Sequence, residues 1–171
     1  MGRGDAPADA VLADWFRGHR FAGSGDRRAI RETVYGDFRA GALRRWAVGI
    51  ADGDPESPRL RAIAGLALET PDELSFLFDG AGYGPPSLNG EEQTMVDAIR
   101  TLDRASAPDN VAGNCPAHLY PLFHDQWGEA AADELTALNA TAPVDLRVNT
   151  LRATREEARS RLAADGYDAD P

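Results

Sequence analysis

The chain has 171 residues, of which 43% are hydrophobic and 27% charged, and these values are ordinary for a globular protein. They exclude a chain that is disordered throughout, and no apolar run reaches the roughly 18 residues that a membrane-spanning helix requires. Eighteen basic residues against 28 acidic ones give a net charge of −10, which argues against non-specific binding of the whole chain to a polyanion. The first residues lack the apolar segment of a secretory signal, and a single cysteine permits no internal disulfide, so we expect a cytoplasmic protein.

The two signs of charge are unevenly distributed. Residues 1–50 contain nine arginines and six acidic residues, whereas residues 51–171 contain nine arginines and 22 acidic residues. All 18 basic residues are arginine, whose planar guanidinium suits phosphate groups and stacking. Any contact with nucleic acid is therefore expected near the start of the chain.

Helical spacing of apolar residues begins early in the chain. Residues 11–16 form one stripe, which includes Trp15. A longer helix is expected from Asp26, with apolar residues at positions 30, 34 and 38, and residues 43–50 predict another helix. We expect these stripes, Trp15 included, to lie in a helical core.

Two later helix starts carry capping signals, and a third helix is expected after them. Ser57 precedes a proline at the first helical position, and residues 70–73 form a capping box with the same proline placement. Asn89 precedes a helix whose apolar residues lie between positions 95 and 102. We expect these helices to pack against the earlier ones.

The pattern changes after a polar, turn-rich segment at residues 105–114. Residues 119–123 and 130–138 predict two helices, residues 144–149 alternate like a β-strand, and a capping box at 154–157 predicts a final helix. One strand is not stable alone, so the α/β part is expected to be incomplete. The sequence therefore predicts a mainly α fold, with a helical domain over residues 1–107 and an incomplete small α/β subdomain over residues 108–171.

Two motifs invite a chemical interpretation that the residues do not support. The glycine-rich segment at 79–84 is followed by Pro85 and Pro86, which remove two amide donors and forbid an immediate helix, so we interpret it as a loop without a cofactor. Cys115, His118 and His124 lack the spacing of a zinc site, and nothing marks Cys115 as a nucleophile. We expect no catalytic, cofactor-binding or metal-ligating residue in this chain.

The polar feature with the strongest functional interpretation is a group of arginines near the start of the chain. Two interpretations stay open: a solvated helix face held by ion pairs, in which Arg28 faces Glu32 four residues on, or a contact with a phosphate backbone, favoured by the local charge. The candidate RNA-binding residues are Arg17, Arg20, Arg27, Arg28 and Arg31.

Several segments together resemble a known family. Residues 7–10, 15–17, 23–30 and 34–36 resemble the N-terminal region of RsmB/NOP-type rRNA cytosine 5-methyltransferases, in the form found in alphaproteobacteria. The segments 114–116, 137–139, 142–143 and 146–151 resemble, in the right order, the entry to the catalytic half of that family.

The resemblance implies a NusB-like helical bundle for RNA binding or docking, then a small α/β subdomain, then a methyltransferase domain that binds S-adenosylmethionine. A cysteine thiolate of the complete enzyme would add to carbon 6 of a cytosine in small-subunit rRNA. This chain lacks the Pro-Gly-Gly cofactor turn and the catalytic cysteines of the family, and Cys115 lies in a different segment. Only six residues precede Pro7, so the resemblance also implies a fragment that lacks a first helix and exposes an apolar patch there.

We therefore expect the RNA-binding or docking portion of an rRNA methyltransferase, without methyltransferase activity of its own, without a metal and without a membrane contact. One alternative is a stand-alone NusB-like module that binds RNA or protein. Another is a helical scaffold whose acidic face meets a basic protein. The strand and helix expected after residue 144 discriminate, because a stand-alone NusB-like module has no need of them.

Overall fold

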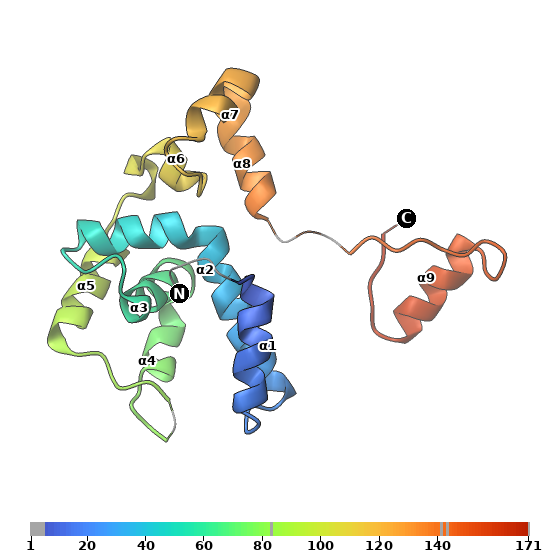
Figure 1. Ribbon diagram of the computed structural model, residues 1–171, viewed down its shortest axis with the longest axis horizontal. Helices are drawn as coiled ribbons and strands as arrows, with labels where there is room; N and C mark the ends of the chain where they lie inside the picture. The colour runs from blue at the N-terminus through green and yellow to red at the C-terminus, as the bar shows by residue number, and fades with distance from the viewer. Residues whose placement is uncertain (1–5, 83, 141, 143, 171) are drawn as a thin grey trace. The chain divides into compact units, whose positions relative to one another are not determined.

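The computed structural model describes residues 6–82, 84–140, 142 and 144–170. Helices and short 3-10 turns make up its regular structure, and no strand occurs in these ranges, so the prediction of a mainly α fold is confirmed (Figure 1). The elements are α1 (Ala8–Gly18), α2 (Ser24–Ile50), α3 (Pro58–Glu69), η1 (Pro71–Glu73), α4 (Leu74–Leu77), α5 (Gly90–Arg100), η2 (Arg104–Ser106), α6 (Asp109–Ala112), α7 (Tyr120–Trp127), η3 (Gly128–Ala130), α8 (Ala131–Asn139) and α9 (Arg155–Ala164).

Contacts divide the chain into two units, Met1–Ala140 and Thr141–Pro171. This division follows α8 and therefore differs from the boundary that the turn-rich segment at 105–114 suggests. The assignment of residues 1–107 and 108–171 to two domains stays a prediction. Within the described ranges, no helix is both long enough and apolar enough to cross a membrane.

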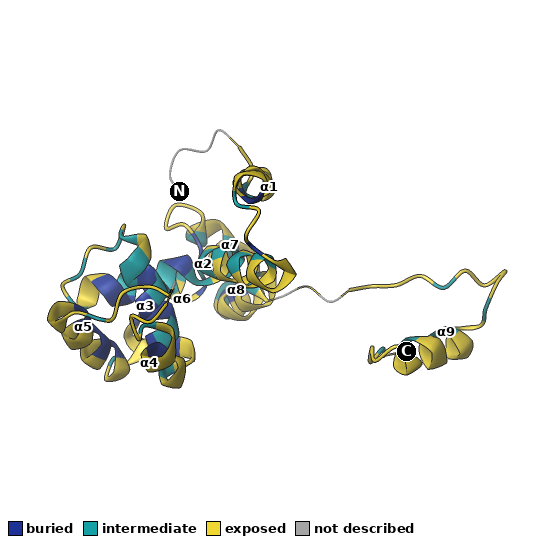
Figure 2. Ribbon diagram, turned by 90° about the horizontal axis from the view of Figure 1, so that it is seen from below, coloured by how far each residue is buried: buried dark blue, intermediate teal, exposed yellow. Residues whose placement is uncertain are grey.

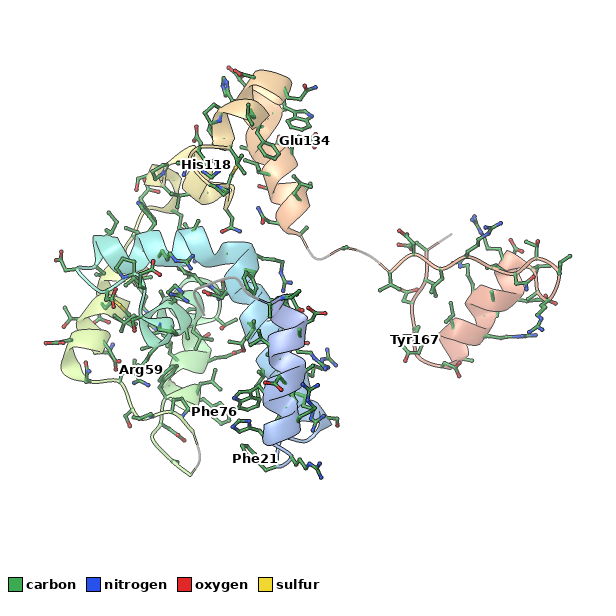
Figure 3. The ribbon with its side chains drawn as sticks, in the orientation of Figure 1. Phe21, Arg59, Phe76, His118, Glu134 and Tyr167 are labelled. Carbon is green, nitrogen blue, oxygen red and sulfur yellow. The ribbon has the colours of Figure 1, made fainter. Side chains whose placement is uncertain are left out.

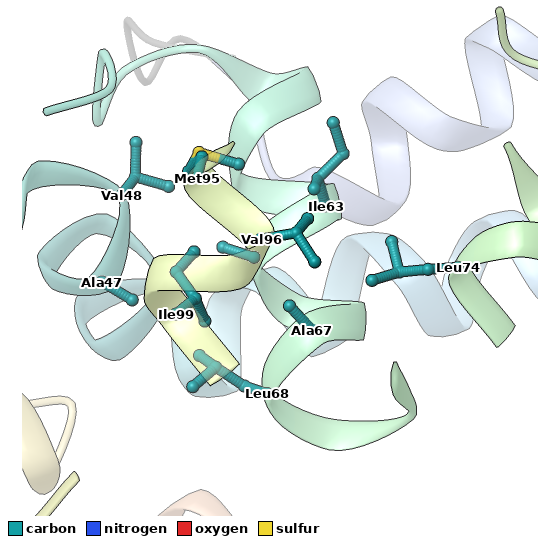
Figure 4. Packing of buried hydrophobic residues seen from close by; sticks show 10 residues of the cluster. Ala47, Val48, Ile63, Ala67, Leu68, Leu74, Met95, Val96 and Ile99 are labelled. Carbon is teal, nitrogen blue, oxygen red and sulfur yellow. The ribbon is translucent and has the colours of Figure 1, made fainter. Parts of the chain in front are cut away.

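The main core of the first unit lies where the second half of α2 meets α3, α4 and α5. Figure 2 shows the buried residues gathered on the faces that these helices turn toward one another. Val48, Ile63 and Val96 are the largest side chains that solvent does not reach, and they come from three different helices (Figure 4). Burial of such side chains is the main source of stability in a helical domain of this size.

A smaller core lies between α1 and the first half of α2. Leu12, Phe16 and Ala22 are buried there against Ile30 and Val34. The stripe expected at residues 11–16 is thus only half buried, because Val11 and Trp15 stay exposed. The expectation that Trp15 lies in the core is wrong.

Helix α2 is continuous from Ser24 to Ile50, where the sequence suggested two helices. It bends in its middle (Figure 1), and Asn114 supplies a physical cause. The Asn114 Nδ2 donates to the carbonyl of Phe38 at 2.8 Å, and its Oδ1 accepts from the amide of Ala42 at 2.9 Å. These two backbone groups are the partners of one helical turn, so the side-chain amide stands within the ladder of α2, an arrangement that bends helices.

Asn114 also links α2 to the helices that follow. Its φ of 48° is left-handed, a conformation that asparagine tolerates better than most residues. Its Nδ2 lies 3.3 Å from Asn139 Oδ1 of α8, and the Asn139 Nδ2 donates to the Gly113 carbonyl at 2.7 Å. Residues of the two segments 114–116 and 137–139 thus meet beside α2.

Two of the three predicted capping signals form: Ser57 accepts from the amide of Leu60, and a full capping box joins Thr154 to Glu157. A capping box that was not predicted joins Asn89 to Glu92 at the start of α5. The capping box expected at Thr70 is wrong, because its side chain makes no cap hydrogen bond and a 3-10 turn follows instead. The helix after it, α4, is correspondingly only four residues long.

In the second unit, the strand expected at residues 144–149 is not formed. Residues 144–149 are described and have no regular structure, because no described segment pairs with them and a strand without a ladder leaves its backbone groups to water. Helix α9 follows as predicted and buries no residue. Gly166, at a φ of 85°, ends it as expected.

Candidate nucleic-acid interface

The five predicted site residues lie in and beside the turn between α1 and α2, whose two ends are fixed by hydrogen bonds. The amide of His19 donates to the Trp15 carbonyl at 3.0 Å and closes α1. The amide of Gly23 donates to the Asp26 carboxylate at 2.9 Å and opens α2. Between residues 17 and 31 there are five arginines and one acidic residue, Asp26, so the turn is a local concentration of positive charge.

Two of the predicted arginines form surface ion pairs. Arg17 lies 2.8 Å from Asp14, and Arg28 lies 2.8 Å from Glu32, one helical turn away. The Arg28–Glu32 pair is the one that the sequence predicts. Such exposed pairs contribute little, about 0.2–1 kcal/mol, so either arginine can exchange its carboxylate for a phosphate at small cost.

Arg27 and Arg31 lie against the small core instead. Each guanidinium carbon is 5.3 Å from the centroid of the Phe16 ring, and Arg27 Nε donates to the Ala22 carbonyl at 2.9 Å. Phe16 is only 4% exposed, partly because these two side chains lie over it. Both arginines therefore have a structural role beside any contact with RNA.

Arg20 lies in the turn itself and is exposed. Among the described residues, no carboxylate lies within ion-pair distance of Arg20, Arg27 or Arg31. The turn thus brings the five predicted arginines onto one end of the α1–α2 pair, with three of them not neutralised by an acidic neighbour.

Sequence reasoning missed two other arginines, Arg44 and Arg61, because their burial depends on residues distant in the chain. Arg61 Nη2 lies 3.2 Å from Asp37, and Arg44 Nη2 lies 2.9 Å from Glu69. The two guanidinium groups form part of the wall of a cavity of about 270 Å³ between α2 and α3. Because carboxylates of α2 and α3 neutralise both, the cavity is no match for an anionic ligand.

Gly65 is what allows the Arg44 guanidinium to lie between α2 and α3. A methyl group at that position would lie 2.8 Å from Arg44 Cζ and Nε. Within the described structure Arg44 Nε is buried without a hydrogen-bond partner, which agrees with its place against the glycine. This arginine is a structural element and no part of a binding surface.

The glycine-rich segment at 79–84 does not fit S-adenosylmethionine. The residues before it form the short helix α4 and no strand, and the amides of Ala81 and Gly84 donate within the loop, to Asp79 Oδ1 and to the Ala81 carbonyl. Tyr83 lies outside the described residues. A cofactor of this kind needs free amides at the start of a helix, so we assign it no residue here.

Arg59 fixes the end of the same loop. Its guanidinium lies 5.0 Å from the Phe78 ring, donates to the Pro86 carbonyl, and holds Glu92 through two hydrogen bonds of 2.6 and 3.0 Å. The hydrogen bonds from Arg59 keep the pKa of the buried Glu92 below its usual value. The loop is thereby attached to α3 and to the start of α5.

The cysteine and histidine residues give no sign of a reactive or metal site. Cys115 is buried, whereas His124 and His118 are exposed, the latter labelled in Figure 3. In the ranges that the structure covers, no three histidine, cysteine or acidic side chains are grouped as metal ligands.

Comparison with known proteins concerns the C-terminal part of the chain. The family described as "Methyltr_RsmF/B-like, ferredoxin-like domain" matches residues 115–171, directly after the Asn114 that stands in the ladder of α2. No curated protein and no solved structure matches the chain. Residues 115–171 are therefore similar in sequence to the ferredoxin-like domain of the RsmF/B-like methyltransferases.

Proposed function

We propose that this chain is the RNA-binding or docking portion of an S-adenosylmethionine-dependent rRNA (cytosine-5) methyltransferase. The observation that carries the proposal is the match of residues 115–171 to the ferredoxin-like domain of the RsmF/B-like methyltransferases. The substrate of the complete enzyme is then small-subunit rRNA in the cytoplasm. The helices before residue 108 would correspond to the NusB-like domain that the sequence resemblance implies. No residue of this chain is assigned to the cofactor or to the chemical step.

The charge distribution supports an RNA contact at the α1–α2 turn. Five arginines and one acidic residue lie between residues 17 and 31, while the remainder of the chain is strongly acidic. Phosphate contacts supply most of the affinity of a protein for RNA, and clustered arginines are their usual source. The contact residues that we propose are Arg17, Arg20, Arg27, Arg28 and Arg31.

The test is RNA binding by the 171-residue chain and its charge-reversal variants. Arg20→Glu with Arg28→Glu removes two exposed arginines that cover no apolar side chain. The matched control is Arg152→Glu with Arg155→Glu, which makes the same change of charge in the second unit, where both side chains are also exposed. Binding to a labelled fragment of small-subunit rRNA is measured by fluorescence anisotropy at several salt concentrations.

We expect the Arg20/Arg28 variant to lose affinity by ten-fold or more and to show a smaller salt dependence, by roughly 0.7 in log–log slope for each phosphate contact removed. The control variant should change less in both quantities. Equal loss in the two variants would show that general charge, and not the α1–α2 turn, attracts the RNA. No measurable binding by the unsubstituted chain would remove the proposal that this portion contacts RNA.

A further inference from the structure

Three aromatic side chains pack together at the end of α1, beside the arginines. The rings of Trp15 and His19 lie parallel, with centroids 3.8 Å apart and planes 7° apart, and the Phe21 ring meets His19 edge-on at 5.7 Å. The His19 Nδ1 donates to the Trp15 carbonyl at 2.7 Å, which fixes the imidazole against the indole. Figure 3 shows Phe21 beyond the end of α1.

Trp15 and Phe21 are exposed and His19 is half-buried, although an apolar core lies directly behind them. Phe21 is 81% exposed and Trp15 38%, while Phe16, in the next position of α1, is buried. Trp15 also meets the Phe16 ring edge-on at 5.5 Å, so the exposed stack rests on a fixed support. An exposed group of aromatic rings contributes little to folding, and such a patch commonly marks a binding surface.

The charge around the stack selects the kind of partner. Arg17 and Arg20 flank His19 in sequence, both are exposed, and the segment 17–31 carries five arginines and one acidic residue. A protein partner with a plain apolar surface would gain nothing from this charge. Aromatic rings within a positively charged surface match unpaired RNA, whose bases stack on the rings while its phosphates meet the cations. Duplex RNA fits less well, because its base faces are already stacked.

We propose that Trp15, His19 and Phe21 form a platform on which unpaired bases of RNA stack, with Arg17 and Arg20 holding the neighbouring phosphates. The inference rests on the proposed RNA-binding function and specifies its substrate class, a single-stranded segment. Phe21 is the most exposed of the three rings and is the one most open to a base.

The experiment compares two probes of identical sequence, a labelled RNA single strand of about 12 nucleotides and the same strand annealed to its complement. The 171-residue chain and the variants Phe21→Ala, Phe21→Trp and Phe76→Ala are titrated by fluorescence anisotropy at several salt concentrations. Phe76, in α4, is 77% exposed and serves as the matched control for loss of an exposed phenyl ring. Circular dichroism checks that each variant keeps its helices.

Phe21→Ala should weaken binding of the single strand about five-fold or more, the lower end of what one stacked base contributes. Its salt dependence should stay unchanged, because no charge is removed. Phe21→Trp should keep the affinity, Phe76→Ala should not alter it, and binding of the duplex should change little in any variant. A second readout is quenching of tryptophan fluorescence by the unlabelled strand, which Trp15→Phe should largely abolish.

The platform is overturned if Phe21→Ala binds the single strand as the unsubstituted chain does, or if it loses duplex binding to the same extent. If the Arg20/Arg28 reversal weakens binding while Phe21→Ala does not, the proposed function stands and the stacking platform fails alone. If the unsubstituted chain binds neither probe, both fail. If Phe21→Ala changes only the association of the chain with itself or with a protein, the rings belong to a protein interface and the proposal is wrong.

Discussion

The most informative single substitution concerns Asn114, whose amide stands within the hydrogen-bond ladder of α2. The variants Asn114→Gly and Asn114→Ala separate the two properties of this residue. Both remove the bonds to the Phe38 carbonyl and to the Ala42 amide. Only alanine also places a Cβ at a φ of 48°, where an L-residue is strained and glycine is not.

The magnitude follows from the bonds that are lost and regained. Two hydrogen bonds contribute about 1 kcal/mol each, and α2 can regain one by closing the backbone bond between residues 38 and 42. Asn114→Gly should therefore lower the free energy of unfolding by about 1–2 kcal/mol. The left-handed conformation adds about 1–2 kcal/mol for alanine, so Asn114→Ala should lose about 2–4 kcal/mol in total.

Urea unfolding followed by circular dichroism at 222 nm gives both values, provided that the slope with denaturant stays the same among the variants. The expected order of stability is the unsubstituted chain, then glycine, then alanine. A glycine variant within about 0.5 kcal/mol of the unsubstituted chain would refute the structural role of the amide. Equal stability of the glycine and alanine variants would refute the role of the backbone conformation.

Two further substitutions test the packing of Arg44 against Gly65 and the ion pair between Arg59 and Glu92. Gly65→Ala should lower the melting temperature, because its methyl group would overlap a buried guanidinium at 2.8 Å and overpacking costs about 1–3 kcal/mol, more than the roughly 1 kcal/mol that alanine gains in a helix. Gly25→Ala, with nothing within 4 Å of the new methyl group, is the control and should be neutral or stabilising. Arg59→Gln should destabilise the chain by about 1–3 kcal/mol near neutral pH, since the bonds from Arg59 lower the pKa of Glu92. A carboxyl whose folded pKa is depressed contributes stability above its unfolded pKa of about 4.3 and loses it as the pH falls through the folded value, so thermal melts of the two proteins should converge in acid. A difference that is the same at every pH would contradict this cause.

Local sequence patterns predicted the parts of the fold that depend on near neighbours. The caps expected at Ser57 and Thr154 formed because each side chain reaches an amide three residues away. The Arg28–Glu32 ion pair also formed, because residues four apart are neighbours on the surface of a helix. The cap expected at Thr70 failed although its sequence pattern was as good, because the amide of Glu73 donates to the Thr70 backbone carbonyl at 3.0 Å in a 3-10 turn, and not to the Thr70 side chain.

Contacts between segments that are far apart in the sequence could not be predicted from such local patterns. The Asn114 side chain accepts a hydrogen bond from the amide of Ala42, 72 positions earlier in the sequence. No sequence pattern near residue 42 predicts that contact. The strand expected at 144–149 does not form, although apolar and polar residues alternate there, because the described residues contain no strand with which it could pair. Alternation of apolar and polar residues indicates which side chains would share one face of a strand. The strand itself is stable only when a neighbouring strand pairs with it.

The candidate site shows the same division. Clustering of charge found the arginines of the α1–α2 turn, but the stripe at 11–16 assigned Trp15 to the core. The helix buries Leu12 and Phe16 and leaves Trp15 exposed to stack on His19. Trp15 and His19 are four residues apart, a spacing at which helical side chains meet. The spacing of Trp15 and His19 was therefore a signal in the sequence for their contact. The exposure of Phe21, which marks this end of α1 as a surface, is visible only in the structure.

The burial of each arginine decides whether it can contact RNA. Residues 17–45 contain eight arginines and three acidic residues, but Arg44 is neutralised in the interior by Asp37 and Glu69 and cannot reach a phosphate. Arg27 and Arg31 cover Phe16, so reversing either would mix the loss of a phosphate contact with the exposure of a core side chain. The other three predicted residues lie in water, where a carboxylate partner is readily replaced by a phosphate. A change in RNA affinity can therefore be assigned to lost contacts only when the substitutions are confined to those exposed positions.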